Sequence, residues 1–108
     1  MGSSRKDFSG FPSAVKSEMG YALYVAQTGS RHARTKMLKG FGSNVIEVIA
    51  NHRGDTFRTI YTVQVADVFV LHAFQKKSKS GISTPKTDLD LIKQRLREAD
   101  NLAREMMR

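Results

Sequence analysis

The side chains best suited to chemistry stand at the end of one apolar segment. Residues 68–74, VFVLHAF, are apolar except for His72, and Lys76, Lys77 and Lys79 follow closely. The apolar, β-branched composition predicts a buried strand that carries two adjacent lysines toward solvent beside a histidine. No pair of acids and no metal-ligand cluster lies nearby. This combination suits a polyanion, and RNA in particular, better than a small metabolite.

His72 and the lysines each allow two interpretations. A histidine in an apolar strand can be a hydrogen-bonded core group, or it can shuttle protons if it shares a groove with Lys76 and Tyr61. Adjacent strand residues face opposite sides, so Lys76 rather than Lys77 is expected on the face of His72. The alternative role of the lysines is solubility and protection of a sheet edge.

Arg58 is the second candidate, within the segment FRTIY at residues 57–61. Its planar guanidinium could clamp a phosphate, or it could form an ion pair with Glu47 across a hairpin. Both can hold together, because a carboxylate can orient an arginine that also binds phosphate.

The segment 30–42 is a basic connector. It is either a solvated loop or a loop that follows the phosphates of a nucleic acid. Its possible cations are Arg31, His32, Arg34, Lys36 and Lys39.

Helices are expected at both ends of the chain. A helical turn covers residues 4–8, a second helix opens at Pro12 and stops near Gly29, and a third begins at Pro85. Apolar residues recur at helical spacing in the second and third. These residues are Val15, Met19, Ala22, Leu23 and Ala26, then Leu89, Ile92, Leu96, Ala99, Leu102 and Met106.

Three strands lie between these helices. They are expected over residues 44–51, over residues 55–65 after a hairpin turn at 53–54, and after a tight turn at 66–67. The sequence therefore predicts a single α+β domain over residues 1–108. Its N-terminal helices pack on a small antiparallel sheet, and a C-terminal helix is attached.

Two-residue turns would set the pairing of these strands. They place Glu47 opposite Ile60 and diagonal to Arg58, and they place Tyr61 opposite His72. A change of one residue in either turn would reverse the faces.

Composition narrows the function. The 108 residues contain 18 Lys plus Arg against 10 Asp plus Glu, giving a net charge of +8 and a pI near 10.1. This charge favours nucleic acid, an anionic membrane surface or an acidic protein as partner. The absence of cysteine excludes disulfides and thiolate chemistry, and the three histidines lack metal-ligand spacing. We expect a cytoplasmic protein, because the sequence has no signal peptide or membrane-length apolar run. We also expect that it uses no cofactor or metal.

Several motifs, in order along the chain, resemble the phage-derived branch of the RelE/ParE superfamily, the HigB-like toxins of type II toxin–antitoxin modules. The resemblance extends from Ser3 to about Ala99. It rests on SSRKDFSGFP, LYVAQTG, MLKGFG, IEVIA, TFRTIY, VFVLHAFQKKS and ISTPKTDLDLIKQRL.

The resemblance implies a RelE-like fold and a toxin that cleaves mRNA in the ribosomal A site and is silenced by an antitoxin. It also implies catalysis without metal by Arg58, Lys76, Lys77 and His72. The RNA-binding residues expected around them are Arg34, Lys36, Lys39, Arg53, Tyr61 and Lys79.

The expected reaction is attack of the RNA 2′-hydroxyl on the adjacent phosphate, which leaves a 2′,3′-cyclic phosphate and a 5′-hydroxyl. Arg58 would hold the phosphate, Lys76 or Lys77 would stabilise charge or act as base, and His72 would act as acid or base. DNA lacks the 2′-hydroxyl and should not be cut.

Three alternatives remain open. The chain could poison DNA gyrase, could survive only as an antitoxin-binding partner, or could bind RNA or the ribosome without cutting. Related toxins carry a strand before the SSRKD motif, which here begins at Ser3, and loss of an edge strand would favour the binding-only alternative. The expected antitoxin carries a helix-turn-helix, so that the toxin would act as corepressor without reading DNA bases itself.

Overall fold

The computed structural model describes residues 4–28, 35–38, 41, 45–64, 67–76 and 86–106, with the backbone alone at positions 4, 5 and 76. The elements in chain order are α1 (Ser4–Ser9), α2 (Ser13–Gln27), β1 (Thr35–Met37), β2 (Val45–His52), β3 (Asp55–Gln64), β4 (Asp67–Lys76) and α3 (Lys86–Met106).

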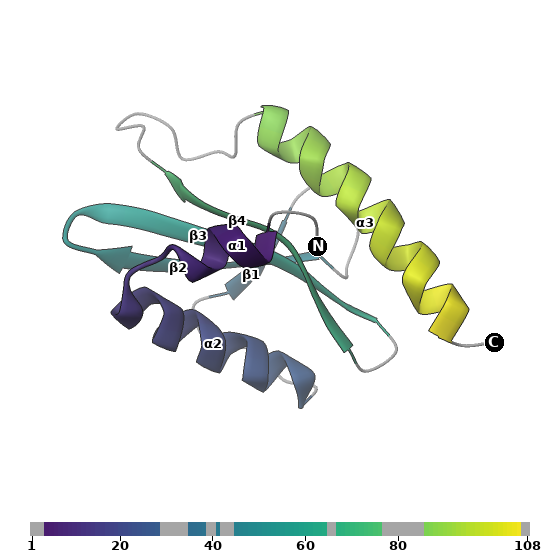
Figure 1. Cartoon of the computed structure of the whole chain (residues 1–108), viewed down its shortest axis with the longest axis horizontal. Helices are drawn as coiled ribbons and strands as arrows, with labels where there is room; N and C mark the ends of the chain where they lie inside the picture. Colours follow the sequence, from purple (N-terminus) through teal and green to yellow (C-terminus); the bar gives the residue numbers. More distant parts are fainter. Residues whose placement is uncertain are drawn as a thin grey trace.

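The strands form one antiparallel sheet in the order β1-β2-β3-β4. In Figure 1, α2 lies on one side of this sheet and α3 on the other, while α1 lies against β4. The predicted α+β class is confirmed. No helix in the described part of the chain is long and apolar enough to span a bilayer.

The N-terminal helices pack as their apolar spacing predicts. Pro12 takes the N-cap position of α2 with φ −55° and ψ 148°, which suits a residue that cannot donate a backbone hydrogen bond. The hydroxyl of Thr59 on β3 donates to Sδ of Met19 at 3.0 Å and ties α2 to the sheet. The core on this side contains Phe11, Val15, Met19, Ala22, Ala26, Ile46, Val48, Ala50, Phe57, Tyr61 and Ala73.

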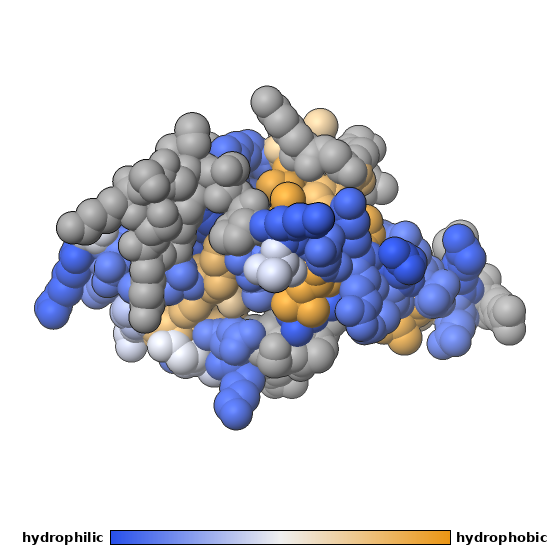
Figure 2. All heavy atoms as spheres, turned by 90° about the horizontal axis from the view of Figure 1, so that it is seen from above, coloured by the Kyte–Doolittle hydropathy of each residue, from blue (hydrophilic) through white to orange (hydrophobic). Residues whose placement is uncertain are grey.

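The opposite face of the sheet packs against α3. Its core is smaller and consists of Val45, Ile60, Leu71, Ile92 and Ala99. Seen from this side, the surface is mostly hydrophilic, with hydrophobic atoms gathered in its middle (Figure 2). The sheet is therefore buried on both faces, by a larger apolar layer under α1 and α2 and by a smaller one under α3.

The turn between β2 and β3 lies at Arg53 and Gly54, as predicted. Both residues have positive φ, 51° and 84°, as a type I′ hairpin turn requires. The resulting register places Glu47 opposite Ile60, which confirms the first predicted pairing.

The second predicted pairing is wrong. Tyr61 lies opposite Val70, and His72 lies opposite Ile60. The strands start their pairing at Gln64 and Asp67, and an extra residue on β4, Leu71, then shifts the register. This β-bulge turns both Leu71 and His72 toward α3, because Leu71 joins the core on that face and His72 bonds α3 directly.

One strand was not expected. The predicted connector 30–42 contains β1, in which Thr35 pairs with Val48 and Met37 pairs with Ile46. Three residues are too few to show an alternating pattern, so only the pairing with β2 reveals this strand.

Candidate functional site

A depression of about 720 Å³ lies where α1, the start of β3 and the end of β4 meet. Polar and aromatic side chains from all three elements meet there, and Lys76 directly follows the last of them on β4. The lining residues are Lys6, Asp7, Gly10, Phe11, Pro12, Asp55, Phe57, His72, Ala73, Phe74 and Gln75.

The same end of the sheet carries the hairpin turn. Thr56 pairs with Lys76, so Arg53, which is exposed in the turn three residues before Thr56, projects beyond the end of β4. Lys6 lines the depression together with two carboxylates, Asp7 and Asp55, and Arg53 lies in the adjoining turn. The lining itself is of mixed charge, and the sequence adds Lys76 and Lys77 directly after it.

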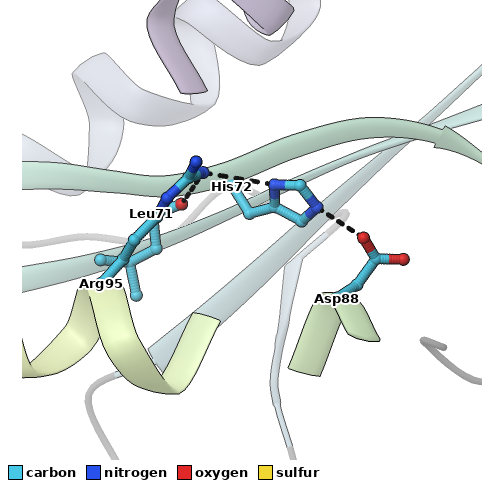
Figure 3. A network of polar contacts seen from close by, with 4 residues as sticks. All are labelled: Leu71, His72, Asp88 and Arg95. Carbon is cyan, nitrogen blue, oxygen red and sulfur yellow. Dashed lines mark hydrogen bonds and ion pairs between the residues drawn. The ribbon is translucent and has the colours of Figure 1, made fainter. Parts of the chain in front are cut away.

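His72 is buried at this site, with 6% of its surface exposed. Figure 3 shows its ring between two residues of α3: Nε2 lies 2.8 Å from Oδ1 of Asp88, and Nδ1 lies 3.4 Å from Nη1 of Arg95. Because an arginine only donates, we assign Nδ1 as the acceptor and the ring proton to Nε2, which then donates to the carboxylate. The interpretation of His72 as a hydrogen-bonded core group is confirmed.

Arg95 also supports the bulge. Its Nη1 donates to the carbonyl oxygen of Leu71 at 2.8 Å (Figure 3). The ring of His72 stacks on Phe74, with centroids 4.8 Å apart and planes at 23°. The bulge, the histidine and the aromatic wall of the depression are therefore one connected unit.

A second polar cluster crosses the sheet. Glu47 is fully buried, and its Oε2 accepts a hydrogen bond from Nη1 of Arg58 at 2.8 Å. Nζ of Lys36 lies 3.6 Å from the other carboxylate oxygen. The expected ion pair of Arg58 is confirmed, and 8% of the Arg58 side chain is exposed. Its guanidinium is held inside the protein, where it compensates a buried carboxylate.

The remaining predicted site residues are distributed differently. Tyr61 is fully buried in the core under α2, on the face away from His72. We therefore do not propose that it contacts RNA. Lys36 is exposed on β1. Four predicted residues lie outside the described part of the chain: Arg34, Lys39, Lys77 and Lys79.

Asp88 and Arg95 were not predicted as site residues. In the sequence, Asp88 is a carboxylate near the start of a predicted helix, and nothing local connects it with a histidine sixteen positions earlier. Arg95 carried a usable signal. It stands between Ile92 and Ala99 on the apolar face of α3, where a charged group requires a buried acceptor.

No group of three or more potential metal ligands occurs among the described residues. In comparison with known proteins, the model of the family described as phage derived protein Gp49-like matches residues 6–97. No curated protein matches the chain.

Proposed function

The chain belongs to the phage-derived Gp49-like family, a RelE/ParE-like toxin family, and from this premise we propose that it cleaves mRNA on the ribosome and so stops translation. The observation that carries the proposal is the end of β4. There His72 and Phe74 line a depression, and the chain passes directly into Lys76 and Lys77.

The lysines are the proposed reactive groups. In this mechanism one of Lys76 and Lys77, uncharged, takes the proton of the RNA 2′-hydroxyl, whose oxygen forms the new bond to phosphorus. The bond from phosphorus to the 5′-oxygen breaks, and that oxygen receives a proton from solvent water. The other lysine, with Lys6 across the depression, neutralises the charge of the transition state.

Supporting roles fall to the buried groups. Both ring nitrogens of His72 are engaged, so its proposed role is to position Phe74 rather than to transfer a proton. Arg58 is hydrogen-bonded to Glu47, so its proposed role is to stabilise the sheet rather than to bind the phosphate directly. Arg53 and Lys36, both exposed, would contact RNA outside the reactive centre.

The test is inducible expression in a bacterial host, with growth and amino-acid incorporation followed over minutes. The variant Lys76→Ala/Lys77→Ala should relieve translation arrest at equal soluble protein. A matched control, Lys86→Ala/Lys93→Ala, removes the same charge from exposed positions of α3 and should remain toxic. Cleaved mRNA should carry 2′,3′-cyclic phosphate ends.

Other outcomes contradict the proposal. Normal growth with folded wild-type protein would identify a binding partner only. DNA-damage signalling without early translation arrest would identify a gyrase-directed toxin. Equal relief by both double variants would show that total charge, rather than the end of β4, matters.

The toxin family implies an antitoxin partner. We infer an acidic antitoxin, because the chain has a net charge of +8 and opposite charge accelerates association. The proposed antitoxin carries a helix-turn-helix and binds DNA for the complex. Excess antitoxin should restore growth in the expression test.

A further inference from the structure

Two residues of α3 hold His72 from both sides. Asp88 stands in the first turn of α3 and accepts from Nε2 of the ring, and Arg95, two turns later, donates toward Nδ1. These contacts favour one tautomer and one ring orientation. The bulge at Leu71 makes this possible, because it points the ring at α3.

Stability alone does not account for this arrangement. Arg95 is buried, with 6% of its surface exposed, between apolar residues of α3. Buried charged groups are often replaced by apolar residues of similar volume without loss of stability. A guanidinium at this position instead fixes two defined acceptors, the carbonyl of Leu71 and Nδ1 of His72. Its hydrogen bonds thus fix the orientation of the end of β4, whatever they add to stability.

We propose that Asp88 and Arg95 are positioning residues for RNA cleavage, which act by holding His72 in its Nε2–H tautomer against Phe74. The inference rests on the proposed function. The ring of His72 stacks on Phe74, and Phe74 forms a wall of the depression directly before Gln75 and the lysines. If the ring turns, the aromatic wall of the depression moves with it.

The first measurement is the nitrogen NMR spectrum of the histidine rings in the intact protein, because ring nitrogens with and without a proton resonate far apart. Three histidines are present, and the spectrum of His72→Gln identifies the signals of His72. Wild type should show the proton on Nε2. Asp88→Ala should produce a mixture of tautomers.

The second measurement is the rate of RNA cleavage by the same proteins. Asp88→Ala should lower the rate at saturating RNA by on the order of 10- to 100-fold, the effect of a small displacement of reactive groups, with little change in KM. Asp88→Asn keeps an oxygen that accepts from Nε2 and should retain most of the rate. The matched control Asp90→Ala removes an exposed carboxylate from the same turn and should change neither measurement.

Arg95→Met removes the donor and keeps an unbranched side chain. It should release Nδ1 and lower cleavage, whereas Arg97→Met, at an exposed position of α3, should not. A variant that melts earlier but keeps the wild-type tautomer and rate would show a merely structural role and overturn the inference. A proton on Nδ1 in the wild type would overturn it as well. If the wild type cuts no RNA, the proposed function fails, and the ring signals alone still decide whether α3 holds His72.

Discussion

Glu47 has no exposed surface, so its carboxylate depends on the cations beside it. Arg58 supplies a hydrogen bond at 2.8 Å, and Lys36 approaches at 3.6 Å from the exposed side. Removal of the closer cation leaves a buried negative charge without adequate compensation, which costs much more than the ion pair contributes.

We therefore expect Arg58→Ala to lower the free energy of unfolding by about 3–5 kcal/mol, measured by urea denaturation. Lys36→Ala should cost less than about 1 kcal/mol, because that lysine is mostly exposed. The double variant Glu47→Gln/Arg58→Met should recover much of the loss. An Arg58→Ala protein of wild-type stability that no longer stops translation would instead favour a phosphate clamp.

The two polar clusters differ in how far the sequence predicts them. Glu47 and Arg58 could be paired in advance, because a two-residue turn at Arg53 and Gly54 sets their register. The neighbours of His72 could not. The pairing of β3 with β4 begins at Gln64 and Asp67, which removes Tyr61 as the partner of His72, and the bulge at Leu71, which has no local signature, then turns His72 toward α3. The site residues that come from α3 depend on this bulge.

At the scale of elements, α2 contains a glycine that neither close packing nor a positive φ requires. Gly20 is exposed in the middle of α2, and a Cβ there would meet no atom within 4 Å. Gly54 is different, because its φ of +84° is a backbone conformation that other residues adopt only with strain.

Alanine should have opposite effects at these two positions. Gly20→Ala should raise the free energy of unfolding by about 0.5–1 kcal/mol, and Gly54→Ala should lower it by about 1–2 kcal/mol. Thermal and urea unfolding of both variants would measure this difference. A loss of stability in Gly20→Ala would contradict the open surface described for α2.

Elements with a long apolar pattern were predictable, and so was the short helix α1, whereas the short strand β1 was not. The 15 residues of α2 and the 21 residues of α3 show repeated apolar spacing, whereas β1, with three residues, has none. The side of the sheet that α3 covers was also beyond local patterns. It is set by contacts across the chain, among them a hydrogen bond from Gln64 on β3 to Asp100.

At the scale of the whole molecule, charge is divided between interior and surface. Among the described residues, the carboxylates of Glu47 and Asp88 contact cationic or imidazole groups of the sheet. At one end of the sheet, Lys6 and Arg53 are exposed near the position where β4 ends in Lys76. Asp7 and Asp55 line the same depression, so binding of a polyanion there would depend on the lysines that follow β4.

RNA affinity should accordingly fall with salt. For a single strand, the slope of log affinity against log salt is about −0.7 per neutralised phosphate, so Lys76→Ala/Lys77→Ala should make the slope shallower by about 1.4 units. Lys86→Ala/Lys93→Ala, on α3, should leave it unchanged. The measurement uses fluorescence anisotropy with an oligonucleotide whose 2′-hydroxyl is replaced at the cleavage site, so that binding is observed without reaction. Added EDTA should change neither binding nor the cleavage of natural RNA, because the proposed mechanism uses lysines and no metal ion. An identical slope in both double variants would place the phosphate contacts away from the end of β4.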